Sequence, residues 1–309
     1  MAGSRIAVVG SVNTDMILRV PRIPQVGETI HGGQFLTAAG GKGANQAVAA
    51  SRAGGRVAFV ARVGRDSFGD RALKALGHDR IDVTRVFRDG VAPSGVALIL
   101  LDRTGQNSIA VAAGANHRLS VADIRKSRST IASAQTLLLQ LETPLNTVRA
   151  AAHLASRKGV RVILNPAPAQ ALPTALLKHV SIITPNESEA ELLTGIKVTT
   201  LSAAKKAAEA LHRLGVPTVI LTMGARGALV SADGIATLVR GFKVKAVDTT
   251  AAGDTFNGAL AVALTEGQSL LQAVRFANAA AAISVTRLGA QPSVPRRQEI
   301  SRFLASCHD

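Results

Sequence analysis

The chain has 309 residues, a formal net charge of +16 and a hydrophobic share of 47%. That share is enough to bury a large core, while the longest apolar runs stay below the ~18 residues that a membrane-spanning helix needs. The N-terminal segment "MAGSRIAVVGSVNTD" predicts a first strand rather than a signal peptide. The single cysteine, Cys307, excludes an intramolecular disulfide, so we expect a cytoplasmic protein.

The excess of basic residues raises the question of nucleic-acid binding. The arginines are scattered, and the densest group, Arg125, Lys126 and Arg128, is short. Aromatic residues make up only 3% of the chain, and none interleave with basic residues to stack on bases. We therefore expect no nucleic-acid partner and no membrane partner. A positive field would instead attract phosphorylated substrates.

Short β-branched runs alternate with segments whose apolar residues have helical spacing. The predicted strands are residues 5–11, 56–64, 136–142, 161–168, 181–186 and 217–224. The predicted helices are residues 43–54, 66–77, 145–159, 187–195 and 201–215. This alternation predicts an α/β fold with a doubly wound, mostly parallel sheet flanked by helices. Ligands of such sheets bind beyond the carboxyl ends of the strands.

Two regions depart from the alternation. Residues 12–37 are extended and rich in Gly and Pro, and residues 95–115 read as two strands joined by a polar turn. Both are β without α, so they are expected to pair into a small second sheet. We predict one domain over residues 1–309, with a β-sheet lid formed from about residues 12–37 and 95–115.

A glycine-rich segment, "AAGGKGANQAVAASRAG", covers residues 38–54. It is not a P-loop, because no Ser or Thr follows Lys42. Its glycines permit close backbone approach to a ligand, and the helix predicted to begin near Ala44 offers free N–H groups beside the Asn45 amide. Such a set suits hydroxyl groups or an anion. An ordinary strand-to-helix turn is the alternative.

A second segment, "VDTTAAGDTFNGALAVAL", places small residues before Asp254 at a predicted helix start. The N–H groups of a helix N terminus are unpaired and the dipole is positive there. The turn of Ala251, Ala252 and Gly253 therefore suits a transferring phosphoryl group, with Asp254 as proton acceptor. We expect the dipole to keep this carboxylate a weak base, which phosphoryl transfer tolerates. The alternative is that Asp254 only caps the helix.

The segment "DTTAAGDTFNGAL" resembles the signature of the ribokinase family, also called the PfkB carbohydrate kinases, and "GGKGANQAVAASRAG" resembles that family's N-terminal signature. The segments "NPAPA", "TPNESEAELLTG", "TMGARGA" and "AAAAISVTRLGAQPSVP" follow in the family's order, so the resemblance covers essentially the whole chain. It implies ATP-dependent phosphorylation of a sugar. The combination of "SVNTD", "GGKGAN", "QLE" and "GAQPSVP" implies D-ribose, phosphorylated at O5.

The resemblance also implies site residues. Asp254 would be the catalytic base, and residues 251–254, Ala251, Ala252, Gly253 and Asp254, would form the anion hole. The sugar site would comprise Asn13, Thr14, Asp15, Gly41, Lys42, Gly43, Ala44, Asn45, Glu142 and Asp254. The nucleotide site would comprise Asn186, Thr222, Met223, Gly224, Ala225, Arg226, Gly227, Gly253, Asp254 and Asn278.

Two metal ions and a dimer are implied in the same way. Glu189 would handle Mg²⁺ through water, because Mg²⁺ keeps much of its hydration shell. A K⁺ ion beside the anion hole would be held by Asp248, Thr250, Ser284, Arg287, Gly289 and Ser293. The exposed edges of the lid strands need covering, and pairing with the lid of a second chain would give a homodimer.

Two alternatives stay open at this stage. The first is another kinase of the same fold, such as a deoxyribokinase or an adenosine kinase-like enzyme. A nucleoside needs an apolar or aromatic wall, which this aromatic-poor chain is short of, and deoxyribose would leave polar groups of the sugar site unpaired. The second alternative is a non-catalytic sugar-sensing homologue, against which the intact "AAGD" turn argues.

Overall fold

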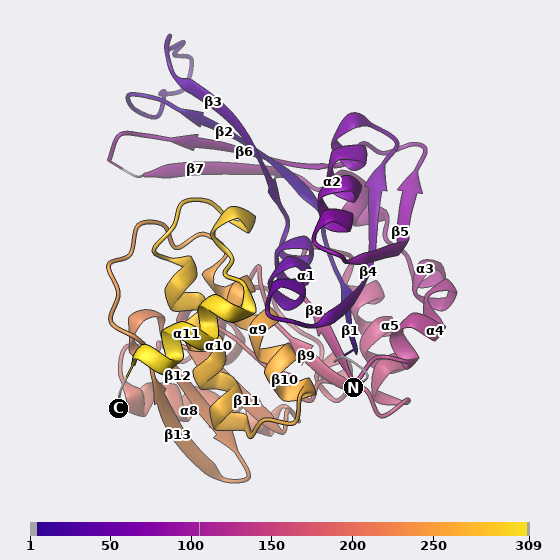
Figure 1. Ribbon diagram of the computed structural model, residues 1–309, viewed down its shortest axis with the longest axis vertical. Coiled ribbons are helices and arrows are strands. Elements are labelled where there is room, and N and C mark those ends of the chain that lie inside the picture. Colours follow the sequence, from indigo (N-terminus) through magenta and orange to yellow (C-terminus); the bar gives the residue numbers. More distant parts are fainter. Residues whose placement is uncertain (1–4, 105, 308–309) are drawn as a thin grey trace.

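A nine-stranded sheet forms the main body of the computed structural model, which describes residues 5–104 and 106–307 (Figure 1). The strand order is β13-β12-β11-β10-β9-β8-β1-β4-β5. The strands from β5 to β11 pair in parallel, and β12 and β13 add an antiparallel edge. The strands are β1 (Arg5–Val9), β4 (Arg56–Gly64), β5 (Asp82–Asp89), β8 (Thr136–Leu139), β9 (Arg161–Leu164), β10 (Ile182–Ile183), β11 (Thr218–Thr222), β12 (Gly227–Ala232) and β13 (Ile235–Arg240).

Helices cover both faces of this sheet. Successive strand residues point to opposite faces, and because the residues on both faces are apolar, each face needs a layer of helices. In β1, Ile6 and Val8 join the core with α1, α9 and α10, and Ala7 and Val9 join the core with α5 and α8. The predicted doubly wound α/β fold is thereby confirmed. The helices are α1 (Lys42–Arg52), α2 (Ser67–His78), α3 (Val121–Lys126), α4 (Arg128–Ala132), α5 (Leu145–Ser156), α6 (Thr174–Leu177), α7 (Glu187–Thr194), α8 (Leu201–Arg213), α9 (Ala252–Thr265), α10 (Leu270–Ser284) and α11 (Arg297–Ser306), with 3-10 turns η1 (Gly114–Arg118), η2 (Gly224–Arg226) and η3 (Gln291–Ser293).

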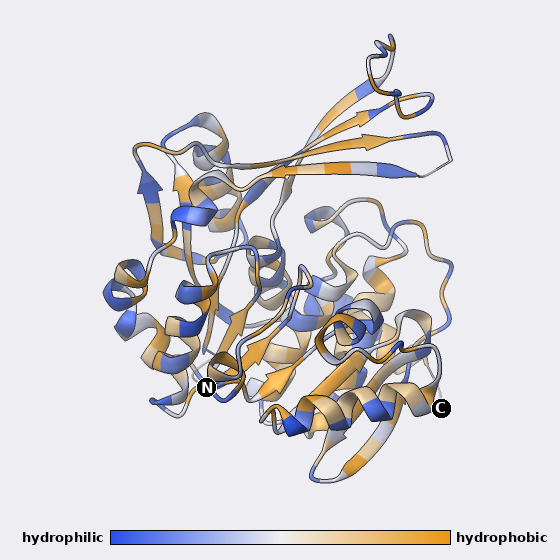
Figure 2. Cartoon of the chain, turned by 180° about the vertical axis from the view of Figure 1, so that it is seen from behind, coloured by the Kyte–Doolittle hydropathy of each residue, from blue (hydrophilic) through white to orange (hydrophobic). Residues whose placement is uncertain are grey.

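A second sheet of four strands, in the order β3-β2-β6-β7, projects from the main body (Figure 1). Its strands are β2 (Asn13–Arg19), β3 (Gln34–Gly40), β6 (Gly95–Leu101) and β7 (Asn107–Ala112). The predicted hairpin is present, because β6 pairs antiparallel with β7. The sheet is mixed, since β2 pairs antiparallel with β3 and parallel with β6. Figure 2 shows that hydrophobic residues run along these strands.

The structure adds elements that the sequence patterns did not predict, notably β5, the β12–β13 hairpin, and α10 and α11. Several predicted strands are also shorter, since β1 ends at Val9 and β8 at Leu139. The residues after these ends turn out of the sheet and form the site described below. None of the helices in the described ranges is long and apolar enough to cross a bilayer.

The packing of α1 against α9 positions the site, and Gly258 permits it. A Cβ atom at Gly258 would lie 2.5 Å from the Cβ of Ala49 and 2.6 Å from the backbone nitrogen of Ala50. Atoms do not approach that closely without a shift, so a side chain here would push the two helices apart. The contact brings the N-terminal parts of α1 and α9 together.

We predict that Gly258→Ala lowers the free energy of unfolding by about 1–3 kcal/mol, because overpacking a close helix contact forces backbone shifts. The matched control is Gly77→Ala, since a Cβ at that position of α2 meets nothing within 4 Å. We expect the control to be neutral, or stabilising by up to ~1 kcal/mol through lower chain entropy. Denaturant unfolding of both variants measures the difference, and equal effects would contradict the prediction.

Candidate active site

The N terminus of α9 is open toward a cavity. Ala251 precedes the helix in the left-handed conformation, with φ of 58°, and its side chain makes no cap hydrogen bond. A Cβ at Gly253 would meet nothing within 4 Å, and Ala252 and Gly253 line a cavity of about 530 Å³. The Ala252 N–H donates to the Thr249 carbonyl at 3.2 Å, and at Gly253 no side chain obstructs the start of the helix, as predicted from the small residues. Such a helix start is an anion-binding site.

Asp254 lies in the first turn of α9 and is 5% exposed. The Asn45 Nδ2 donates to its Oδ2 at 3.0 Å, and the Gln46 Nε2 donates to its Oδ1 at 3.0 Å. Burial raises the pKa of Asp254 above its usual range, although the charge of Lys42 and these two hydrogen bonds oppose the shift. The direction of this shift differs from our expectation that the helix dipole makes Asp254 a weak base. Loss of hydration penalises the charged form more than the surrounding donors favour it.

Lys42 begins α1 and lies among three carboxylates. Its backbone N–H donates to Glu142 Oε2 at 2.9 Å. Burial lowers the pKa of the Lys42 ammonium, but the negative charges of Asp254, Glu142 and Glu189 outweigh burial and leave the pKa raised. Lys42 is therefore a stable cation whose charge interacts with the predicted base Asp254, with Glu142, predicted for the sugar site, and with Glu189, predicted for the metal site.

Asn13 and Asp15 come from β2, where they share one face of the small sheet. Asn13 is 7% exposed and accepts a hydrogen bond of 2.8 Å from Asn116 Nδ2. Burial and the nearby charge of Glu142 raise the pKa of Asp15 to about 6. Thr14, also predicted for the sugar site, lies on the opposite face of β2 because side chains alternate along a strand.

The glycine-rich segment owes its composition to close backbone packing. Gly41 has φ of 88°, and a Cβ there would lie 2.7 Å from the Asn13 backbone nitrogen. At Gly43 a Cβ would lie 2.4 Å from the Ser11 backbone nitrogen. Ala44 is 1% exposed and belongs to the hydrophobic core. These three residues position α1 against β1 and β2, and any ligand contact from them would come from the backbone.

The cavity beside Gly253 contains most of the predicted nucleotide residues. Its predicted members are Asn186, Thr222, Gly224, Ala225, Gly227, Gly253 and Asn278. Met223 is instead buried in the core at 3% exposure, and the Arg226 side chain forms an ion pair with Glu187. Sequence patterns missed an apolar wall, to which Phe242, Val244, Phe256, Ala281, Ala282 and Val285 contribute. A flat apolar base fits such a wall, next to the polar helix start.

Glu189, which the sequence predicts to handle Mg²⁺ through water, forms the capping box of α7 with Asn186. It is 7% exposed, and its two oxygens accept hydrogen bonds from the Asn186 backbone N–H at 2.9 Å and from Asn186 Nδ2 at 3.0 Å. Burial raises its pKa, although Asn186 and the charge of Lys42 oppose the shift. Within the described ranges, no group of three or more His, Cys, Asp or Glu side chains forms a metal cage. The residues fit an ion that takes most ligands from water and phosphate.

Asp248 joins two of the segments that carry the residues predicted for K⁺. Its carboxylate accepts hydrogen bonds from the backbone N–H groups of Thr250 at 2.9 Å and of Gly289 at 2.8 Å. Burial raises the pKa of Asp248, but these hydrogen bonds outweigh burial and lower it. Asp248, Thr250 and Gly289 are thus brought together. Ser284 and Arg287 share the turn before Gly289, and Ser293 is fully buried in η3.

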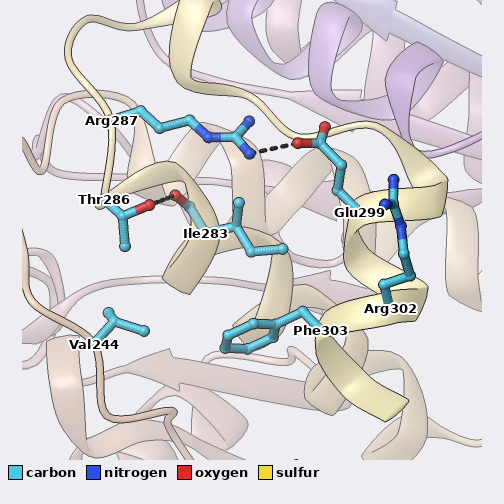
Figure 3. A pocket seen from close by; sticks show the side chains of 7 residues that line it. All are labelled: Val244, Ile283, Thr286, Arg287, Glu299, Arg302 and Phe303. Atoms are coloured by element: carbon cyan, nitrogen blue, oxygen red, sulfur yellow. Dashed lines mark hydrogen bonds and ion pairs between the residues drawn. The ribbon is translucent and has the colours of Figure 1, made fainter. Parts of the chain in front are cut away.

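The Arg287 side chain points away from this loop and pairs with Glu299 (Figure 3). The pair borders a separate pocket of about 370 Å³, whose apolar side is formed by Val244, Ile283 and Phe303. Any cation contact from Arg287 would therefore use its backbone carbonyl.

Several buried amides around the site were not predicted as site residues. Gln46 contacts Asp254, Asn165 and Gln140, while Gln291 donates to Asn45 Oδ1 at 3.2 Å. Asn116 accepts from the Val12 backbone N–H at 2.8 Å and donates to Asn13. Gln46, Gln140 and Gln291 adjoin predicted residues in "GANQ", "QLE" and "GAQPSVP", and this proximity was the available signal.

The open helix start and the buried carboxylate adjoin the 530 Å³ cavity and a polar cluster, which consists of Asn13, Asp15, Lys42, Asn45 and Glu142. This arrangement is that of a phosphotransferase. Comparisons with known proteins agree that the chain is a carbohydrate kinase. The family model for pfkB family carbohydrate kinases matches residues 4–297. A ribokinase of Haemophilus influenzae is 48% identical over 97% of this chain and 98% of its own length. A deoxyribokinase of Salmonella typhi is 37% identical over 97% of this chain and 98% of its own length.

Among solved structures, Arabidopsis thaliana ribokinase complexed with ribose and ATP superimposes with a TM-score of 0.91 and 35% identity. It covers 98% of this chain and 99% of its own. The chain belongs to the pfkB family of carbohydrate kinases.

Asp15 generates a prediction about stability and pH. With a pKa of about 6, against 3.8 ordinarily, Asp15 binds its proton more tightly in the folded chain than in the unfolded chain. The free energy of unfolding therefore falls as pH rises from 3.8 to about 6, and the full loss is present above that range. We expect Asp15→Asn to gain about 1–3 kcal/mol of unfolding free energy over wild type near pH 7.5, and much less near pH 4.5. Denaturant unfolding of the ligand-free protein at both pH values tests this, and a pH-independent difference would contradict it.

Proposed function

We propose that this protein transfers the γ-phosphoryl group of ATP to O5 of D-ribose, giving ribose 5-phosphate and ADP. The observation that carries the proposal is the position of Asp254, in the first turn of α9 between the cavity and the Lys42 cluster. The similarity to proteins named ribokinase, and to one solved with ribose and ATP, supports the choice of both substrates.

The sugar is proposed to bind at the polar cluster. Asp15 and Glu142 accept hydrogen bonds from its hydroxyl groups, and Asn13, Lys42 and Asn45 donate to them. Backbone groups of Gly41, Gly43 and Ala44 complete this wall, and Thr14 acts only through its backbone. Because these polar groups are largely buried, a sugar that lacks a hydroxyl leaves one of them unpaired, at a cost of about 1–3 kcal/mol.

In the reaction, the O5 oxygen attacks the γ-phosphorus and the bond to the bridging oxygen of ADP breaks. The O5 proton passes to the Asp254 carboxylate. The raised pKa of Asp254 makes it a better acceptor than an ordinary aspartate. The amides of the 251–254 turn face the oxygens of the moving group, where negative charge is spread in a loose transition state.

ATP is proposed to bind in the 530 Å³ cavity, with its base against the apolar wall near Phe242 and its phosphates toward Gly253. The 222–227 turn, with Met223 and Arg226, contributes backbone groups. When bound, Mg²⁺ neutralises phosphate charge, and Glu189 is placed to hold its water. A K⁺ ion on carbonyls near Asp248 would keep the 251–254 turn in its anion-binding shape. The small sheet acts as a lid that excludes water, in a single cytoplasmic domain.

The alternative substrate 2-deoxyribose is supported by one observation, since a deoxyribokinase is also similar over nearly the whole chain. The decisive experiment is a coupled ADP-release assay on ribose, 2-deoxyribose and adenosine, with and without K⁺. We expect the highest kcat/KM with ribose, and a lower rate without K⁺. A preference for 2-deoxyribose or adenosine would overturn the substrate proposal and leave the family unchanged.

The negative control in that assay is Asp254→Asn, which keeps the shape of the side chain and removes the base. We expect turnover of ribose to fall by at least 10³-fold, while calorimetry still detects ribose binding. Turnover near the wild-type rate would show that Asp254 is not the base.

We further propose that the small sheet pairs with its copy in a homodimer. On the face that carries Asp15 the strands expose large apolar side chains, with Leu36 45%, Ile109 54% and Val111 58% exposed. Phe35 and Leu98 are also exposed but lie on the opposite face, because they pair with Leu18 and Met16. Ile17 lies on the same face of β2 as Asp15. Leu36 of β3, Ile99 of β6 and Ile109 of β7 are in register with Ile17 across the sheet, so Leu36 and Ile109 share that face. A contiguous apolar face of this kind typically marks an interface.

We therefore expect Ile109→Lys to shift the protein from dimer to monomer in sedimentation velocity, because a charge at the interface must be desolvated. The matched control is Ile235→Lys, since Ile235 is 68% exposed on the remote β13. A monomeric wild-type protein, or an equal effect of both variants, would contradict the proposal.

A further inference from the structure

Gln46 is a buried side chain of α1 that contacts the base directly and has no exposed surface. Its Nε2 donates to Asp254 Oδ1 at 3.0 Å and to Asn165 Oδ1 at 3.1 Å. Its Oε1 accepts from Gln140 Nε2 at 2.6 Å. All of its hydrogen-bonding partners are therefore protein groups, and Asp254 is the only charged one among them.

The backbone determines the direction of each bond in this network. The Asn165 Nδ2 donates to the carbonyl oxygen of Thr184 at 3.2 Å, and a carbonyl can only accept. Asn165 must therefore present its Oδ1 to Gln46, and Gln46 must present its NH₂ group. One hydrogen of that group goes to Asn165 and the other to Asp254. An amide flip would break both bonds, so Gln46 is held as a donor.

Gln46 and Asn45 together restrict the carboxylate. Each oxygen of Asp254 accepts one of these hydrogen bonds, Oδ1 from Gln46 and Oδ2 from Asn45. A carboxylate oxygen has two acceptor positions, so each keeps one. With both oxygens held, the group cannot rotate about its Cβ–Cγ bond without losing a buried hydrogen bond, which costs about 1–3 kcal/mol.

We propose that Gln46 is a positioning residue, which holds the Asp254 carboxylate in the orientation that receives the proton of the alcohol. This inference rests on the proposed phosphoryl transfer. It follows the general arrangement in which a third group orients the base of a nucleophile–base pair. Gln46 acts through Asp254, and being fully buried it does not touch the sugar.

The same contact affects the protonation of Asp254. Burial raises its pKa, and the hydrogen bonds from Asn45 and Gln46 are among the causes that lower it. The charged groups that act on Asp254 are Lys42, Glu142 and Glu189, and Asp15 acts on the site through Glu142. Loss of the Gln46 donor therefore raises the pKa of Asp254 further. Asp15 titrates near pH 6, but it is unchanged in the variants compared below.

The test is Gln46→Met, which keeps side-chain length and removes the donor. We expect kcat for ribose near pH 7 to fall by at least about tenfold, with KM for ribose changed less than about threefold. The acid limb of the kcat–pH profile should move up by about one unit, as the loss of one charge-assisted hydrogen bond implies. A wild-type kcat and acid limb in the folded variant would overturn the inference.

The matched control is Gln140→Met. Gln140 is 1% exposed and belongs to the same network, but its loss leaves both hydrogen bonds to Asp254 in place. We expect it to lower the thermal unfolding temperature as Gln46→Met does and to leave the acid limb in place. An equal shift of the limb in both variants would show a general structural effect and would overturn the inference.

If Gln46→Met does not fold, Gln46→Glu provides a second test with the same shape. Two carboxyl groups in contact share a proton, so the acid limb should move up by more than one unit. An unshifted limb in this variant would equally overturn the inference. If the wild-type protein does not phosphorylate ribose, the proposed function is wrong, and the ADP-release assay on the wild type detects this separately from any effect of Gln46.

Discussion

The contact between α1 and α9 is the constraint on which the site depends. Gly258 lets the two helices approach so closely that no side chain fits between them. Because of this approach, Asn45 and Gln46 of α1 reach the carboxylate of Asp254 in the first turn of α9. Asp254 is thereby removed from water and supplied with two donors at once. Its basicity is a property of the helix pair rather than of either helix.

Charge balance around Lys42 completes this arrangement. A buried carboxylate alone would take up a proton, and several carboxylates around one cavity would repel each other. Lys42 is charged because Asp254, Glu142 and Glu189 surround it, and its charge in turn favours the ionised form of Asp254 and Glu189. Three carboxylates that come from different elements, Asp254, Glu142 and Glu189, are thus electrostatically coupled through one side chain.

Much of the architecture was predictable because it follows from local patterns. The β-branched runs became the parallel strands, and the breaks in the alternation at residues 12–37 and 95–115 contain the strands of the small sheet, except that β3 continues to Gly40. The small residues before Asp254 do leave the helix start open. The β12–β13 hairpin was missed because "GALVSADGIATLVR" follows the glycine-rich 222–227 turn, whose composition had been interpreted only as nucleotide-binding.

The sequence by itself determined the alternation of strands and helices, the open helix start with its aspartate, and the family, because each is written in contiguous residues. Tertiary structure alone decided the burial and the hydrogen-bond partners of Asp254. Asn45 and Asp254 are 209 residues apart in the chain, and the direction of the Gln46 amide depends on a carbonyl of Thr184 in a third segment. Burial and hydrogen-bond direction arise from segments distant in sequence. The helix dipole, which is local, therefore led us to expect the opposite direction of shift for the pKa of Asp254.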